Sequence, residues 1–336
     1  MKHEISFFSA VLALWMALSA PAQAESIVLA VPGPGSLTYL PVYLAKALAA
    51  DEAEGLQVKL RYFGGGPLAL RDMNERNSEF SVVGMPAIAS ARADGMPLLA
   101  IGQLSQSAMY VFLLRANLKD RVRTLAQLKG RRIGAGSSTS KSRSMGAMMT
   151  GYLLERAGLK SGDVQMISSG QSREATRAAL SSNTVDAFLA DEPFASELVA
   201  EGLAVKLADL YPPEKSKSLL GGPIVHAALT TREDVYAQHP ATVKKVQRMF
   251  DRTLLWMAQH SAQEVIAKLG GQPGFEAAQG KLLIEILQRS QGMFPDHVAW
   301  DAQAVATTER FFHRMATDPQ ESNLPFADFV RPVSLE

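Results

Sequence analysis

The sequence predicts an α/β protein with two lobes, each a mainly parallel sheet flanked by helices, followed by a helical C-terminal tail. Apolar runs of strand length alternate with amphipathic segments of helix length, which is typical of parallel β-α-β units. Two passages, residues 27–101 and 131–207, repeat the same order of strands, turns and helices. After about residue 220 the alternation gives way to successive amphipathic helices.

The first passage begins with an apolar strand from residue 27, a Pro/Gly/Ser turn and a helix. It continues through a second strand and the glycines 64–66 to a short apolar run, Phe80–Val83. Gly84-Met85-Pro86 follows that run and leads into another helix.

The second passage has the same layout. Residues 133–149, IGAGSSTSKSRSMGAMM, read as a short strand, a hydroxyl-rich turn and a helix. Val185–Leu189 matches Phe80–Val83 and precedes Asp191-Glu192-Pro193. The repeat therefore predicts two lobes of similar design with a cleft between them.

The remaining chain predicts a return to the first lobe. Ile224–Thr230 reads as a strand, and the tail helices are expected to pack on that lobe. The chain would cross between lobes near 105–110 and near 218–222, and two crossings make a hinge. The expected organisation is a leader (1–24), the first part of lobe 1 (25–108), lobe 2 (109–220), and the return strand with its helices (221–336).

The N-terminus predicts export. Lys2 precedes a nearly apolar run, Ile5–Leu18, and Ala22-Gln23-Ala24 follows, which is the pattern of a signal peptide cut after Ala24. A retained membrane anchor is the alternative. The chain has no cysteine, so it has neither disulfides nor a cysteine for lipid attachment, and a periplasmic location is expected. A net charge of +1 gives no support to a nucleic-acid partner.

Six turns follow the predicted strands at the edge where open sheets bind ligands. All six are rich in Gly, Ser, Pro or acidic residues: 33–39, 64–67, 84–87, 137–141, 169–172 and 191–194. Turns also use such residues for conformational reasons alone. Six of them in register on two lobes favour a ligand site.

The hydroxyl-rich turn is expected to open a helix. Free N–H groups and the hydroxyls of Ser138, Thr139 and Ser140 would then face an anionic or strongly polar group. A serine that only caps the helix is the alternative, and whether Lys141 or Arg143 adds charge stays open.

Other side chains could complete this site. Asp191 and Glu192 could accept hydrogen bonds from an amine or hydroxyl of the ligand, form a salt bridge between lobes, or lie exposed. An amino group here, with an anionic group at the helix start, would make the ligand zwitterionic. Tyr39 and Tyr110 are candidates for the cleft wall, whereas Tyr43, four residues into the helix, is expected in the core.

Nucleotide, metal and catalytic sites find little support. A phosphate-binding loop ending at Lys141 would need glycine where Ala135 and Ser140 stand, and Thr139 breaks the dinucleotide pattern. No His-x-x-His pair or Gly-x-Ser-x-Gly turn occurs, and His226 is expected to be structural rather than a ligand contact. We therefore expect no cofactor, no metal and no enzymatic activity.

Several motifs resemble one protein family over residues 25–310. They are Gly-x-Leu-x-Tyr-Leu-Pro-Val-Tyr-Leu-Ala-Lys at 35–46, Phe-x-Val-Val-Gly-x-Pro at 80–86, Leu-Lys-Gly-Arg-Arg-Ile-Gly at 128–134, and Val-Asp-Ala-Phe at 185–188 with Glu-Pro at 192–193. They resemble the solute-binding proteins of ABC transporters of the nitrate/sulfonate/taurine type, which share a fold with thiamine-pyrimidine synthases.

The resemblance implies a type II periplasmic-binding fold. A monomer would capture a small polar or anionic solute between its lobes and deliver it to a membrane permease and ATPase. A thiamine-pyrimidine-precursor binding or synthase-like protein, and a receptor that reports to a membrane sensor, are the alternatives. The identity of the solute stays open.

Matching the family's turns to this chain, together with the chemistry above, gives twelve expected ligand-binding residues. They are Ser36, Thr38, Tyr39, Gly65, Gly66, Met85, Ser138, Thr139, Ser140, Gln171, Asp191 and Glu192.

Overall fold

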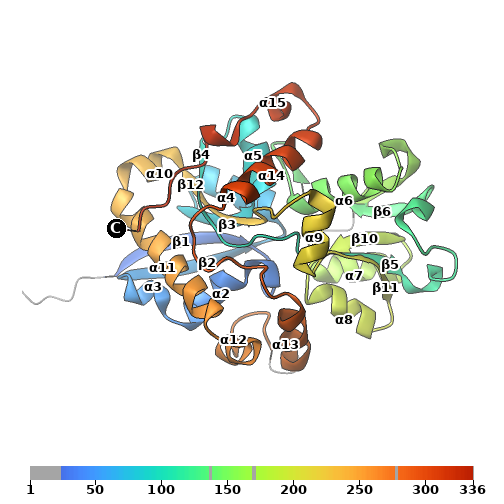
Figure 1. Ribbon diagram of the computed structural model, residues 1–336, viewed down its shortest axis with the longest axis horizontal. Coiled ribbons are helices and arrows are strands. Elements are labelled where there is room, and N and C mark those ends of the chain that lie inside the picture. Colours follow the sequence, from blue (N-terminus) through green and yellow to red (C-terminus); the bar gives the residue numbers. More distant parts are fainter. Residues whose placement is uncertain (1–23, 136–137, 169–171, 277–278, 336) are drawn as a thin grey trace, which may run out of the picture.

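A computed structural model describes residues 24–135, 138–168, 172–276 and 279–335. The described chain forms two five-stranded sheets, each flanked by helices, which lie side by side as two lobes (Figure 1). The predicted two-lobed α/β class is therefore confirmed. No helix in these four segments is both long and apolar enough to cross a bilayer.

The first sheet has the strand order β2-β1-β3-β12-β4. Strand β1 pairs in parallel with β2 and β3, whereas β12 runs antiparallel to both β3 and β4. The strands are β1 (Glu25–Pro32), β2 (Leu56–Phe63), β3 (Phe80–Gly84), β4 (Leu98–Gln103) and β12 (Ala227–Arg232).

The second sheet has the order β11-β5-β10-β6-β9. Strands β10, β6 and β9 are parallel, and β5 is antiparallel to both β10 and β11. The strands are β5 (Val111–Arg115), β6 (Arg132–Ala135), β9 (Gln165–Ser168), β10 (Ala187–Ala190) and β11 (Ala204–Asp209).

Both sheets are mixed, which refines the expectation of mainly parallel sheets. The β-α-β units of each lobe are parallel as predicted. The antiparallel strands are β12 and β5, the first strands after the two crossings between lobes. Each of these strands enters its sheet at the carboxyl end of a parallel strand, with Ala227 beside Gly84 and Val111 beside Ala190, and therefore runs in the opposite direction.

Helices of the first lobe follow its strands and cover its sheet (Figure 1). They are α2 (Leu40–Ala47), α3 (Ala50–Ala53), α4 (Gly66–Asn74) and α5 (Met85–Ala93), with a 3₁₀ turn at Leu37–Tyr39. The second lobe carries α6 (Met145–Arg156), α7 (Arg173–Ser181), α8 (Phe194–Ala200) and α9 (Pro213–Leu220), with 3₁₀ turns at Ala116–Leu118, Leu125–Leu128 and Ser161–Asp163.

Several C-terminal helices contact helices of the first lobe. Helix α11 lies against α2 and α3, and α14 and α15 lie against α5. The helices of this region are α10 (Glu233–Gln238), α11 (Pro240–Ala258), α12 (Ala262–Leu269), α13 (Gly280–Arg289), α14 (Ala302–Arg314) and α15 (Pro319–Ser322), with a 3₁₀ turn at Phe326–Asp328.

Helix α13 also contacts the second lobe, which the tail prediction missed. Arg289 forms an ion pair with Glu192 and another with Asp209 at 2.7 Å, and Gln279 donates a hydrogen bond to Glu197 at 2.7 Å. The hydrophobic cluster that contains Leu40 of α2 and Ile286 of α13 also contains side chains of the second sheet. The tail therefore joins the lobes instead of covering only one.

Two crossing segments, 104–110 and 221–226, run between the lobes and bond to each other. The N–H of Ile224 donates to the carbonyl oxygen of Gln106 at 3.2 Å, and that of His226 donates to Ser105 at 3.1 Å. The predicted return strand at 224–230 therefore starts later, at Ala227, because residues 224–226 are still part of the crossing.

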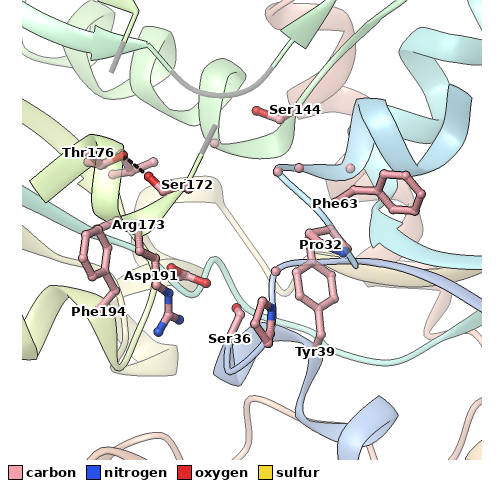
Figure 2. Close-up of a pocket in the computed structure, with 18 of the residues that line it drawn as sticks. Pro32, Ser36, Tyr39, Phe63, Ser144, Ser172, Arg173, Thr176, Asp191 and Phe194 are labelled. Atoms are coloured by element: carbon pink, nitrogen blue, oxygen red, sulfur yellow. Dashed lines mark hydrogen bonds between the residues drawn. The ribbon is translucent and has the colours of Figure 1, made fainter. Parts of the chain in front are cut away.

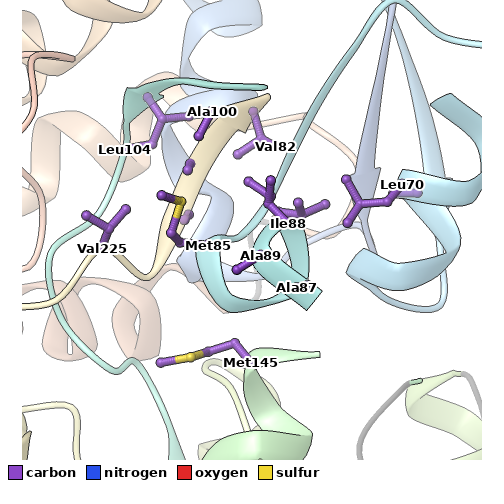
Figure 3. Close-up of a cluster of buried hydrophobic side chains, with 14 of the residues drawn as sticks. Leu70, Val82, Met85, Ala87, Ile88, Ala89, Ala100, Leu104, Met145 and Val225 are labelled. Carbon is purple, nitrogen blue, oxygen red and sulfur yellow. The ribbon is translucent and has the colours of Figure 1, made fainter. Parts of the chain in front are cut away.

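The lobes touch closely beside α5. Figure 3 shows Met145 of α6 beneath α5, next to the buried cluster that includes Ile88 and Val82. A Cβ atom placed on Gly84 would lie 2.9 Å from the Cβ of Met145, so only glycine fits without movement. Gly84 has a φ of −62°, so its role is close approach and not an unusual backbone conformation.

The hydroxyl-rich turn does not open a helix, and that expectation was wrong. Ser138–Thr139 (β7) and Ser142–Arg143 (β8) form a short antiparallel hairpin, and α6 begins only at Met145. Bonds to the first lobe hold the hairpin: the Ser142 hydroxyl donates to the carbonyl of Ala87 at 2.8 Å, and Arg143 forms an ion pair with Glu321.

Candidate ligand-binding site

A cavity of about 710 Å³ lies between the lobes and is lined from both sheets. Figure 2 shows Ser36 and Tyr39 on the first-lobe side, and Arg173, Asp191 and Phe194 on the second-lobe side. The carboxyl ends of the parallel strands meet here, so the turns that follow them form the walls.

On the first-lobe wall, the turn after β1 presents Ser36 and Tyr39. The Ser36 hydroxyl is buried and has no hydrogen-bond partner among the described residues, although the residue lines the cavity. A buried hydroxyl without a hydrogen-bond partner destabilises the protein. A bound solute that formed a hydrogen bond with this hydroxyl would remove that cost and bind more tightly. Ser36 and Tyr39, both expected ligand residues, therefore lie at the cavity.

Glycines form the rest of this wall. Gly65 and Gly66, both expected ligand residues, line the cavity with Gly64 and Gly84. A Cβ on Gly66 would lie 3.3 Å from that of Val83, so the missing side chain lets the start of α4 pack closely on β3.

Two helices of the second lobe begin at the cavity. The hydroxyl of Ser144 accepts a hydrogen bond from the N–H of Ala147 at 3.1 Å and caps α6, and Ser172 caps α7 through Ala175 at 3.1 Å. At α6 the free N–H groups of the first turn carry partial positive charge. At α7 the carboxylate of Glu174, which also lines the cavity, accepts a hydrogen bond from its own N–H. The expected helix start therefore exists, but at Ser144 instead of Ser138–Ser140.

Arg173 brings a full positive charge to the same wall. Its guanidinium lies 5.5 Å from the ring centre of Phe194 and donates to the carbonyl oxygen of Gly35, across the gap between lobes, at 3.2 Å. Arg177, one turn further along α7, also lines the cavity and lies 5.4 Å from the Phe194 ring centre, but it forms ion pairs with Glu197 and Glu201.

The adjacent acids have different environments. Asp191 lines the cavity. Glu192 is fully buried, and its carboxylate accepts hydrogen bonds from Ser196 and Arg289. Burial raises the pKa of Glu192 although these partners act in the opposite direction. Glu192 thus stabilises the fold, and its predicted place at the ligand is corrected.

Aromatic side chains line much of the cavity: Tyr39, Tyr62, Phe63, Tyr110, Phe188 and Phe194. Burial raises the pKa of Tyr39 and Tyr110 well above the usual range, so both hydroxyls keep their protons at neutral pH. Tyr43 is fully buried in the core, as expected.

Several expected ligand residues lie elsewhere. Thr38 is buried in the 3₁₀ turn, and Met85 packs in the core. Ser138 is exposed on the hairpin, whereas Thr139 and Ser140 line a separate pocket of about 210 Å³ with Lys141 and Arg143. Gln171, the last of the twelve, lies outside the described residues.

His226 does not reach the cavity wall, as expected for a structural histidine. It is fully buried at the crossing between lobes, and burial lowers its pKa to about 4. The ring is therefore neutral at neutral pH. No group of His, Asp or Glu side chains in the described segments is arranged to hold a metal ion.

Sequence reasoning missed the cavity residues Ser144 and Arg173. Ser144 precedes a run of helix formers, and it is as good a helix-capping signal as the serines at 138–140. Arg173 directly follows the capping Ser172. A signal for both was therefore present, but spacing alone did not show which serine starts each helix.

A family model described as NMT1/THI5 like matches residues 37–264. No curated protein sequence matches the chain. Several solved structures resemble it in fold across most of its length. One, of a protein from Bordetella bronchiseptica RB50, has a TM-score of 0.80 with 20% identity and covers 92% of this chain and 95% of that one.

Two further structures of similar fold have named ligands. The alkanesulfonate-binding protein SsuA of Xanthomonas axonopodis pv. citri, bound to MOPS, has a TM-score of 0.68 and 20% identity, with 92% and 99% of the two chains covered. The periplasmic nitrate-binding protein NrtA of Synechocystis PCC 6803 has a TM-score of 0.68 and 14% identity, with 92% and 86% covered. At these identities the likeness shows the shared periplasmic-binding-protein fold.

Proposed function

The chain belongs to the NMT1/THI5-like family, and we propose that it is the solute-binding component of an ABC importer. It captures a small polar or anionic organic solute between its lobes and catalyses no reaction. The observation that carries this proposal is the inter-lobe cavity, whose walls bring together Arg173, the start of α6 and a Ser36 hydroxyl that has no partner among the described residues.

The size and lining of the cavity favour an organic solute over a bare oxyanion. Its volume of about 710 Å³ falls within the range of about 300–1,000 Å³ that is typical of sites for organic molecules. Aromatic side chains would contact the carbon skeleton, and Arg173 with the start of α6 would bind an acidic group. Asp191 would accept a hydrogen bond from an amine, so we expect a solute with both kinds of group.

We further propose that the protein acts in the periplasm after cleavage behind Ala24. Strand β1 begins at Glu25, directly after the proposed cleavage point, which supports a mature chain that starts with its first strand. A membrane permease and an ATPase are the expected partners. The names of the alkanesulfonate- and nitrate-binding proteins of similar fold support this assignment.

The aromatic lining favours one second candidate. Tyr39, Tyr110 and Phe194, with Asp191 beside them, suit a planar nitrogen heterocycle such as a thiamine-pyrimidine precursor.

A thermal-shift screen separates these ligand classes. The mature chain is heated with alkanesulfonates, taurine, nitrate, pyrimidines or small carboxylates. A ligand that binds only the folded state raises the melting temperature by mass action. We expect the largest increase with taurine or a short alkanesulfonate. An increase with pyrimidines alone would favour the second candidate, and no increase with any class would contradict both.

A further inference from the structure

His226 lies where the two crossing segments meet. Its backbone N–H donates to the carbonyl oxygen of Ser105 at 3.1 Å, and its own carbonyl accepts from Met85 at 2.9 Å, at the start of α5. Its side chain is fully buried and turns toward the first crossing segment. One residue therefore contacts the hinge and the edge of the first-lobe wall.

The imidazole ring links this crossing to the cavity through Tyr110. Nε2 lies 3.2 Å from the Tyr110 hydroxyl oxygen, and the two ring centres are 4.9 Å apart. Tyr110 lines the cavity, whereas His226 does not. The histidine can thus influence a solute only through the tyrosine.

The neighbours of Nδ1 decide where the ring carries its proton. Nδ1 lies 3.2 Å from the N–H nitrogen of Met109 and 3.0 Å from the carbonyl oxygen of Ser107. A neutral ring can satisfy only one of them, because Nδ1 either accepts or donates. The backbone hydrogen of Met109 is fixed by the peptide plane and points at Nδ1, whereas the imidazole proton can occupy either nitrogen.

An N–H group buried without an acceptor is rarer than a carbonyl group without a donor. Met109 therefore favours an unprotonated Nδ1 that accepts its hydrogen bond. The proton then resides on Nε2, which donates to the oxygen of Tyr110.

This arrangement leaves the tyrosine hydrogen without an acceptor among the residues that the structure describes. The Tyr110 oxygen accepts from His226, so its own O–H is free to donate toward the cavity. Burial raises the pKa of Tyr110, so the hydroxyl remains a donor at neutral pH. Gly146, at the start of α6, lies beside this hydroxyl, because a Cβ placed on it would be 3.5 Å from the oxygen.

We propose that His226 is a positioning residue that makes Tyr110 a hydrogen-bond donor to the solute by donating its Nε2–H to the tyrosine oxygen. The N–H of Met109, in the first crossing segment, determines which ring nitrogen carries the proton. The hydrogen bond between His226 and Tyr110 therefore connects the hinge to the cavity. The part that concerns the solute rests on the proposed function; the position of the proton does not.

The proton position is measured without any solute. ¹⁵N NMR of protein labelled at histidine distinguishes a protonated from an unprotonated ring nitrogen, and the His226→Gln variant identifies the signal by its loss. We expect a protonated Nε2 and an unprotonated Nδ1. A protonated Nδ1 would overturn the proposal, because the tyrosine hydrogen would then be used by the ring.

The effect on the solute is measured with ethanesulfonate and taurine as probes. Tyr110→Phe removes only the hydroxyl, and loss of a hydrogen bond to a charged acceptor weakens binding by about ten-fold or more. His226→Gln places an amide N–H near the Nε2 position and should bind within about three-fold of wild type. His226→Asn reaches only the Nδ1 position and should weaken binding as Tyr110→Phe does.

The two histidine variants distinguish positioning from a purely structural role. Melting temperatures of all variants show whether each is folded. Equal affinities of His226→Gln and His226→Asn, with both proteins folded, would overturn the proposal. If wild type binds neither probe, the assigned solute class fails, and the NMR measurement still decides where the proton lies.

Discussion

At the residue scale, Asp191 and Glu192 are adjacent acids whose different burial could not be predicted from the sequence. The sequence presents two equivalent acids after β10. The structure directs Asp191 to the cavity and encloses Glu192 between Ser196 and Arg289. Arg289 lies 97 residues away in sequence, so no local pattern could indicate which acid is buried.

Arg173 is the residue whose change should affect solute binding most directly. Arg173→Gln removes the positive charge that faces the cavity and should weaken ethanesulfonate binding by about ten-fold or more, as for a lost charge-assisted hydrogen bond. Isothermal titration calorimetry measures the change. Arg177→Gln is the matched control, because Arg177 lines the same cavity and contacts the same Phe194 ring but has its charge paired with Glu197 and Glu201. Equal losses in the two variants would contradict a specific role of Arg173.

His226 should make the protein less stable in acid. An exposed histidine has a pKa of about 6.5, whereas burial lowers the pKa of His226 to about 4. Between these values the unfolded chain binds a proton that the folded chain does not. The stabilisation is therefore complete above pH 6.5 and is lost as the pH falls toward 4, by about 3 kcal/mol in total.

Urea unfolding of wild type and His226→Gln at several pH values isolates this effect. Other acidic and basic groups titrate in both proteins and cancel in the difference. The free energy of unfolding should fall less steeply below pH 6.5 in the variant. If the free energy of unfolding fell equally steeply with pH in both proteins over this range, His226 would not be buried in its neutral form.

At the element scale, the hairpin at 138–143 and helix α6 show where helix-start signals fail. Several serines and one threonine at 137–144 could each cap a helix. The choice of Ser144 follows from contacts with the other lobe: Ser142 bonds to Ala87, and Arg143 to Glu321. Long-range contacts extend the chain through 143, so the helix begins later than the local pattern suggested.

Removal of the observed cap tests this assignment. Ser144→Ala removes the hydroxyl that accepts from the N–H of Ala147, and loss of such a cap costs about 1 kcal/mol. Urea denaturation should show this decrease in the free energy of unfolding. Ser138→Ala, on the exposed hairpin, should change it by less than about 0.5 kcal/mol. A larger decrease for Ser138→Ala than for Ser144→Ala would mean that Ser138, and not Ser144, caps the helix.

At the scale of the whole molecule, the alternation of strands with helices and the repetition of this order in two passages were sufficient to predict two α/β lobes. Strand and helix periods are local properties that packing preserves. The contact of α13 with the second lobe could not be predicted from the sequence. The amphipathic pattern of Gly280–Arg289 indicates that the helix has a buried face, but not which residues cover that face. Its partners in the second lobe come from chain segments far away in sequence.

Closure of the lobes around a solute can be tested with an introduced disulfide. The chain contains no cysteine, so Gly84→Cys with Met145→Cys supplies its only two thiols. A Cβ on Gly84 would lie 2.9 Å from that of Met145, and a disulfide needs about 3.5–4.5 Å. A small separation of the lobes should therefore allow the bond, which joins the first-lobe strand β3 to the second-lobe helix α6.

Thiol titration and small-angle X-ray scattering report the outcome. Oxidation should consume both thiols within one molecule. If the hinge opens without solute, the reduced variant should have the larger radius of gyration, because only the oxidised form is held closed. The single variant Gly84→Cys, under the same oxidant, controls for links between molecules. Identical scattering of the oxidised and reduced forms would mean that the lobes do not open. Failure to form the bond would mean that the two Cβ atoms do not reach the separation that a disulfide needs.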